Sequence, residues 1–122
     1  FSFRNSLSVS KKPNDYSYLK VNKQNYVYDV SEKKKISSKP FLDHAIVGIF
    51  YFQKIQYFFE GIKLVREKNH RINNEFYIDS IIKLLAKKKY KTKVFEISSY
   101  IGWGTPNDLR VFNYWKKYFS KK

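Results

Sequence analysis

The sequence predicts an α/β protein with a mixed β-sheet and flanking helices. Aromatic and β-branched residues cluster in short segments of the N-terminal half, whereas apolar residues recur at three- and four-residue steps further on. Hydrophobic residues make up 43% and aromatic residues 20%, which is too apolar for a disordered chain despite the net charge of +15. A chain of 122 residues suits one domain, or half of a larger one, and can bury a real core.

Strands are expected in the N-terminal half. Residues 16–21 and 26–30 are rich in aromatic and β-branched residues, and the turn-like residues 22–25 join them as a hairpin. Residues 45–52 are almost uninterrupted apolar sequence, which fits a strand covered on both faces. We therefore expect residues 45–52 to form the central strand.

Helices are expected in the C-terminal half. Helical periodicity spans residues 55–65 and 78–85, residues 93–98 return to strand character, and residues 109–119 form a final helix. Thr105 suits the N-cap of this last helix, with Pro106 in its first turn and Asp108 placed to reach back to the cap. The predicted order is β-β-β-α-α-β-α.

Composition excludes several kinds of site. The chain has no Cys, so it holds neither disulfides nor thiolate ligands. No apolar run approaches the ~20 residues of a membrane span, and the first residues form neither a signal nor a transit peptide, so we expect a cytoplasmic location. We expect His44 and His70 to be lone surface histidines. Because the chain starts at Phe1 and contains no Met, we expect a fragment or a chain that has lost its N-terminal part.

The positive charge has two explanations. It fits an anionic partner such as nucleic acid, a membrane surface or a phosphorylated small molecule. However, Lys greatly outnumbers Arg, and Asn, Ile, Tyr and Phe are abundant too, which is the bias of an AT-rich genome. We rank this bias above selection for a polyanion.

Two loops carry candidate ligand-facing residues. Trp103 stands between Gly102 and Gly104, so the backbone can approach a ligand while the indole forms a wall. Asn74 and Glu75 precede a predicted helix, where Asn favours a cap and the acid favours the helix dipole. Inside the apolar segment, Gly48 weakens a strand and often marks the close approach of a ligand or another backbone.

Four motifs in order resemble a known family: Val-Ser-Glu-Lys at 30–33, the apolar segment at 45–52, Asn-Glu-Phe-Tyr at 74–77 and Trp-Gly-Thr-Pro at 103–106. Together they resemble the C-terminal half of the sugar-phosphate nucleotidyltransferases, which have a GT-A-like α/β fold, from about Phe3 to Phe119. The resemblance implies that residues 1–122 are a partial nucleotidyltransferase domain, the sugar-phosphate-binding half, without the nucleotide-binding N-terminal half.

The resemblance implies substrate-binding roles for these residues: Glu32, Lys33, Gly48, Asn74, Glu75, Trp103 and Gly104. In the family, the matching Glu-Lys pair holds sugar hydroxyls and faces the sugar phosphate, the matching glycine lines the sugar pocket, and the acid that matches Glu75 grips the sugar ring. As an alternative, Glu32 starts a solvated charge run with residues 33–35. We expect Glu32, Lys33, Gly48, Glu75 and Trp103 to line one polar hollow.

The intact enzyme would join a sugar 1-phosphate to a nucleoside triphosphate, supplying activated sugars for polysaccharide or glycoconjugate synthesis. The sugar phosphate attacks the α-phosphorus and expels pyrophosphate, while Mg²⁺ and basic side chains neutralise the developing charge. The commoner family pattern has a metal-binding Asp at the position of Gly102, so we assign no metal ligand in this chain. No Gly-rich triphosphate loop occurs, so we expect this segment alone to be inactive.

Two alternatives remain. A basic, non-enzymatic module could bind nucleic acid through residues 33–35, residues 87–89 and the C-terminal lysines, with interleaved tyrosines for stacking. No recognition-helix or RNA-binding signature occurs, so we do not expect nucleic acid as a partner. The chain could also be a truncated, inactive relative that exposes apolar surface where the other half would have paired. Which sugar and which nucleotide are used does not follow from these residues.

Overall fold

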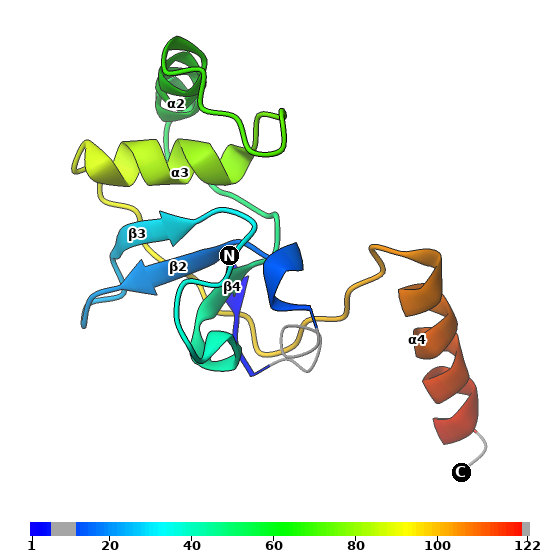
Figure 1. Cartoon of the computed structure of the whole chain (residues 1–122). Helices are drawn as coiled ribbons and strands as arrows, with labels where there is room; N and C mark the ends of the chain where they lie inside the picture. Colours follow the sequence, from blue (N-terminus) through cyan, green and yellow to red (C-terminus); the bar gives the residue numbers. More distant parts are fainter. Residues whose placement is uncertain (6–11, 121–122) are drawn as a thin grey trace.

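The computed structural model describes residues 1–5 and 12–120. Within them the chain is mixed α/β, with a four-stranded antiparallel sheet and three α-helices (Figure 1). The sheet order is β1-β4-β2-β3. The strands are β1 (Ser2–Phe3), β2 (Tyr18–Val21), β3 (Val27–Ser31) and β4 (His44–Ile46); the helices are α2 (Ile55–Glu67), α3 (Ile78–Lys87) and α4 (Pro106–Phe119), with 3-10 turns η1 (Pro13–Asp15) and η2 (Pro40–Leu42).

The predicted hairpin is confirmed as β2 and β3, which pair antiparallel. Asn22 closes its turn, because Oδ1 of Asn22 accepts hydrogen bonds from the backbone N–H groups of Gln24 and Tyr26, each at 3.0 Å. Asn25 takes a positive φ of 63°, which Asn tolerates better than most residues. The turn chemistry read from residues 22–25 therefore has a direct physical basis.

The predicted long central strand is wrong in its length. Of the predicted strand 45–52, only residues 45 and 46 are extended, as the end of β4. The strand β4 lies between β1 and β2 and is therefore interior. Shortly after β4, Gly48 adopts a φ of +84°, which lies in the left-handed region and cannot continue an extended strand. The apolar residues after Gly48 therefore leave the sheet instead of extending it.

Residues 93–98 do not form the predicted strand. They contribute isolated bridges, antiparallel between Lys93 and Tyr26 and parallel between Glu96 and Ser2. The four strands themselves pair antiparallel throughout, so the expected mixed sheet reduces to an antiparallel sheet with one parallel bridge beside β1. The strand β1 was not predicted, because its two residues are too few for a period-2 pattern.

The helices α2 and α3 confirm the helical periodicity and form two successive layers. α3 covers one face of the sheet and α2 packs on the outer side of α3 (Figure 1). Between the sheet and α3 lie the buried residues Leu19, Val27, Val30, Ile46 and Ile82; between α3 and α2 lie Leu64, Val65, Ile81, Leu84 and Leu85. Gly61 makes this approach possible, because a Cβ there would lie 2.1 Å from Cγ2 of Ile81.

The opposite face of the sheet is covered by loops. Phe3, Tyr18 and Ala45 are buried there, and the ring of Tyr100 stacks on Phe3 with centroids 4.2 Å apart. This stacking attaches the segment that leads into α4 to the body of the protein.

The final helix, α4, begins as the sequence predicts. Thr105 Oγ1 accepts a hydrogen bond from the backbone N–H of Asp108 at 3.2 Å, and Oδ2 of Asp108 accepts one from the backbone N–H of Thr105 at 3.0 Å, which is a capping box. Unlike α2 and α3, this helix has no buried residue, and it projects away from the sheet (Figure 1). Among the helices described, none has the length and apolar character needed to cross a membrane.

Candidate functional site

Residues from three of the four motifs line one hollow of about 410 Å³, called here the Lys33 hollow. Lys33 follows β3, Gly48 follows β4, and Phe76 and Tyr77 precede α3. Its remaining walls include Tyr100 and the carboxylates Asp15 and Asp79. The hollow therefore combines a cation, acidic hydrogen-bond acceptors and aromatic rings.

Lys33 is held at this hollow by its backbone and by its side chain. The residue has a positive φ of 51°, and its backbone N–H donates to Oγ of Ser17 at 3.2 Å. Its ammonium donates to the backbone carbonyl of Asp15 at 3.2 Å and lies 5.3 Å from the ring centroid of Tyr77. One carbonyl uses one of the three N–H donors of an ammonium, so the group retains capacity for an anionic ligand.

Glu75 reaches the Lys33 hollow only through Tyr77, whose hydroxyl donates to Oε2 of Glu75 at 2.7 Å. This hydrogen bond is the main cause that raises the pKa of the Tyr77 hydroxyl. Tyr77 is the residue that precedes the first turn of α3, so the interpretation that Asn74 caps this helix and Glu75 lies in its first turn is wrong. Asn74 instead has a positive φ of 63° in the preceding turn, where its carbonyl accepts from Nη1 of Arg71 at 3.0 Å.

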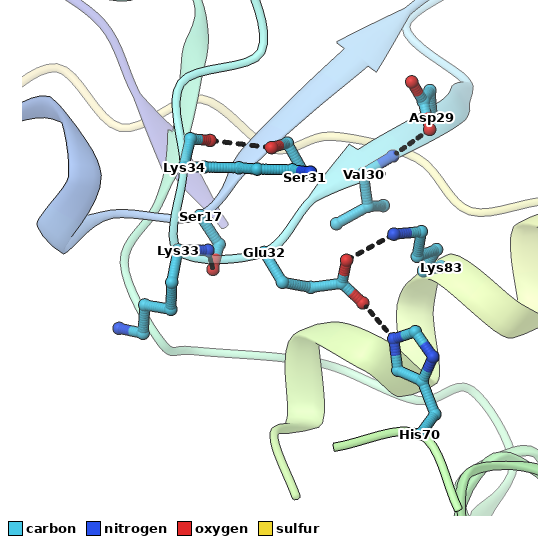
Figure 2. A network of polar contacts seen from close by, with 9 residues as sticks. All are labelled: Ser17, Asp29, Val30, Ser31, Glu32, Lys33, Lys34, His70 and Lys83. Carbon is cyan, nitrogen blue, oxygen red and sulfur yellow. Dashed lines mark hydrogen bonds and ion pairs between the residues drawn. The ribbon is translucent and has the colours of Figure 1, made fainter. Parts of the chain in front are cut away.

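Glu32 lies on the other side of the chain from Lys33, in a buried ion-pair network (Figure 2). Its carboxylate accepts a hydrogen bond from Nζ of Lys83 on α3, and its Oε1 lies 2.7 Å from Nε2 of His70. With a side chain only 3% exposed, Glu32 neither belongs to a solvated charge run nor lines the Lys33 hollow.

The environment of Glu32 favours its charged form. Burial by itself raises the pKa of the carboxyl, but the hydrogen bonds from Lys83 and His70, together with their charges, outweigh burial and lower the pKa. A buried carboxylate with two such partners is strongly fixed in position. It therefore anchors the end of β3 to α3, immediately before Lys33.

Trp103 and Gly104 lie outside the Lys33 hollow. The indole of Trp103 is 59% exposed and packs against Phe112 of α4, with ring centroids 5.0 Å apart. A Cβ at Gly104 would meet no heavy atom within 4 Å. Of the five residues expected to line a single hollow, Lys33 and Gly48 do so, and the expectation is wrong for the other three. Glu32 faces α3, Glu75 contacts Tyr77 without bordering the hollow, and Trp103 packs against α4.

A second hollow of about 490 Å³, called here the α4 hollow, lies between the body and α4. It is bordered by Gly102, by Thr105 of the fourth motif and by Val111, Phe112 and Trp115 of α4. The two hollows are neighbours, since their linings share Asp15, Tyr16 and Tyr100. The fourth motif thus borders the α4 hollow, whereas the first three motifs line the Lys33 hollow.

The histidines are not the lone surface residues that the sequence predicts. Nδ1 of His44 lies 3.0 Å from Oγ of Ser2, and burial is the main cause that lowers the pKa of His44. His70 contacts Glu32. Sequence reasoning also missed Lys83; the one available signal is a lysine within the otherwise apolar run 81–86 of a helix.

Metal binding finds no support in this part of the chain. In residues 1–5 and 12–120, no cluster of three or more His, Asp or Glu side chains could hold a metal ion.

No family model, curated protein or solved structure matches this chain. The interpretation of the site therefore depends on the four motifs and on the geometry of the Lys33 hollow.

Proposed function

We propose that this segment forms the sugar-phosphate-binding side of a sugar-phosphate nucleotidyltransferase, an enzyme that makes nucleotide-activated sugars for polysaccharide or glycoconjugate synthesis. One observation carries the proposal. Lys33, Gly48 and Tyr77, which come from three separate motifs, line the same hollow. A volume of about 410 Å³ lies within the range of small-molecule sites, roughly 300–1,000 Å³.

The lining suits a phosphorylated sugar chemically. The Lys33 ammonium supplies a compact positive charge for the phosphate. Carboxylates of Asp15 and Asp79 are acceptors for sugar hydroxyls, and the rings of Tyr77 and Tyr100 offer flat apolar faces to the C–H side of a sugar. Gly48 keeps one wall open, because a Cβ there would meet no atom within 4 Å.

The remaining motif residues act indirectly in this proposal. Glu75 orients the hydroxyl of Tyr77 through their hydrogen bond. Glu32 is a positioning residue, because its contacts with Lys83 and His70 fix the end of β3 and hence the place of Lys33. Nucleoside triphosphate binding and Mg²⁺ belong to the nucleotide-binding half of such an enzyme.

The direct test titrates glucose 1-phosphate into the isotope-labelled chain and follows backbone amide shifts by NMR, with glucose and inorganic phosphate as separate probes. We expect shifts around Lys33, Gly48 and Tyr77. Lys33→Gln removes the charged hydrogen-bond donor and should weaken binding roughly tenfold or more. Lys34→Gln is the matched control, since Lys34 is exposed and lies outside the hollow.

Equal affinities of the wild type and Lys33→Gln would contradict the proposal, as would shifts confined to other surfaces. A random single-stranded oligonucleotide that binds tightly at physiological salt would instead favour the nucleic-acid module.

A second pair of variants tests the link between Glu75 and Tyr77. Tyr77→Phe removes the hydroxyl and Glu75→Ala removes its acceptor, so both should weaken glucose 1-phosphate binding to a similar extent. Their combination should cost little more than either change, because coupled residues are not additive. Unchanged binding in Glu75→Ala would remove the role proposed for this residue.

A further inference from the structure

The helix α4 presents large apolar side chains to solvent. Trp115 is 49% exposed, Phe119 is 61% exposed and Tyr114 is 63% exposed. Val111, Trp115 and Phe119 follow one another at four-residue steps and therefore share one face of the helix. The rings form a continuous group, since the Trp115 centroid lies 5.3 Å from that of Tyr114 and 5.9 Å from that of Phe119.

The body of the protein covers this face only at its start. Val111, Phe112 and Trp115 border the α4 hollow, whereas Phe119 does not, and the later turns of the helix project away from the body (Figure 1). An exposed aromatic group of this size marks an interaction site. We therefore expect a partner outside the described residues to cover this aromatic face.

The charges of α4 identify the kind of partner. With about 100° between successive residues of a helix, Arg110 and Lys117 lie opposite the Trp115 face, and Lys116 lies at its edge. The one acidic side chain of the helix, Asp108, is held in the capping box. The helix therefore combines an apolar face with positive charge, while its acid is committed to the helix start. A net charge of +15 opposes the close pairing of two copies and favours an anionic surface.

We infer that α4 binds the surface of an anionic lipid bilayer and lies in the interfacial plane. An amphipathic helix with aromatic residues on one face and Lys or Arg on the other suits this position. Trp and Tyr rings favour the headgroup level, where one edge is apolar and the other is hydrated. The apolar side chains of one short helix bury too little area for stable binding by themselves. Binding therefore needs both the aromatic face and the cations, and it is reversible.

The test mixes the full chain with vesicles of phosphatidylcholine alone, or of equal parts phosphatidylcholine and phosphatidylglycerol, and measures the sedimented fraction. We expect binding to the anionic vesicles, little binding to the neutral ones, and weakening as salt rises. Lys116→Gln with Lys117→Gln should weaken binding roughly 30-fold. Lys34→Gln with Lys35→Gln is the matched control, since it removes the same charge from an exposed loop.

A second double variant, Trp115→Ser with Phe119→Ser, tests the aromatic face. Neither residue is buried, so the body should keep its unfolding transition while vesicle binding falls by at least tenfold. Equal binding to neutral and anionic vesicles, or equal loss in the two lysine pairs, would overturn the inference. The inference would also be overturned if the chain bound neither kind of vesicle and formed concentration-dependent dimers in analytical ultracentrifugation.

This inference is independent of the proposed function, because the sugar-phosphate test reads the Lys33 hollow and the vesicle test reads α4. Failure of either leaves the other unaffected.

Discussion

The helices α3 and α4 both carry apolar side chains at helical spacing, but their surroundings are opposite. α3 buries Ser80, Ile81, Ile82, Leu84 and Leu85, whereas α4 buries no residue at all. α3 lies between the sheet and α2, so two neighbours cover its apolar side chains. α4 is joined to the body through the segment around Tyr100. An apolar stripe therefore shows that a helix has a face to cover, but not what covers it.

The largest effect should come from the same substitution made in both helices. Leu85→Ala empties a site that is 3% exposed and should lower the free energy of unfolding by about 2–5 kcal/mol. Leu109→Ala in α4 should change it by less than about 0.5 kcal/mol, because Leu109 is already half-exposed. Urea unfolding followed by circular dichroism measures both. Similar losses in the two variants would mean that α4 packs as tightly as α3.

The next effect concerns the buried ion pair that joins α3 to β3. Lys83→Met leaves the Glu32 carboxylate buried with His70 as its remaining partner and should cost about 2 kcal/mol, less than for a fully buried pair because Lys83 is partly exposed. Lys63→Met is the matched control on α2. Its pair with Glu67 is exposed and long at 3.8 Å, so the loss should stay under about 0.5 kcal/mol.

The pH dependence of this difference follows from the lowered pKa of Glu32. A carboxyl whose pKa is lower in the folded than in the unfolded chain adds stability above its ordinary value of 4.5, and this stability is lost as pH falls through the lowered pKa. The gap in unfolding free energy between the wild type and Lys83→Met should therefore be full at neutral pH and shrink in acid. A gap that stays constant down to strongly acidic pH would rule out Glu32 as its origin.

A smaller effect should separate two glycines. Gly61→Ala places a Cβ 2.1 Å from Cγ2 of Ile81, and the resulting overpacking, roughly 1–3 kcal/mol, should exceed the gain of about 1 kcal/mol in helix propensity. We expect a net loss of about 1 kcal/mol. Gly104→Ala, beside α4, meets no atom within 4 Å and should be neutral. Thermal unfolding of both variants gives the comparison, and a stabilised Gly61→Ala would show that α2 shifts freely on α3.

The smallest global effect should come from the cap of α4. Thr105→Ala removes the capping box and should destabilise the helix locally by about 1 kcal/mol. Because α4 has no buried residue, the unfolding of the body should stay unchanged while the helical signal of the native chain falls. Amide exchange would place the loss in α4. A matching loss in the sheet amides would instead show that α4 and the body unfold together.

Elements governed by local chemistry were predictable from sequence. The hairpin follows from its turn residues, both inner helices from their apolar spacing, and the start of α4 from the Thr105 cap. Elements set by distant partners were not. Residues 45–52 read as one strand because apolar character does not reveal the left-handed φ of Gly48, and residues 93–98 read as a strand although only isolated bridges pair them.

In the candidate site, too, some residues were predictable from local sequence and others depended on distant partners. The motifs predicted Lys33 and Gly48 as candidates, and both line one hollow. The adjacent residue Glu32 turns the other way, because Lys83 and His70 stabilise its charge on the α3 side (Figure 2). These partners lie far from Glu32 in sequence, so no local pattern reveals the network.

By itself, the sequence determined where turns, caps and amphipathic helices form, because those depend on interactions between residues close together in the chain. Only the tertiary structure decided which apolar faces are covered, which charges are paired and which motif residues share a hollow. These outcomes depend on burial and on contacts between distant segments, and the free energy of a charge or an apolar ring changes more with its surroundings than with its neighbours in sequence.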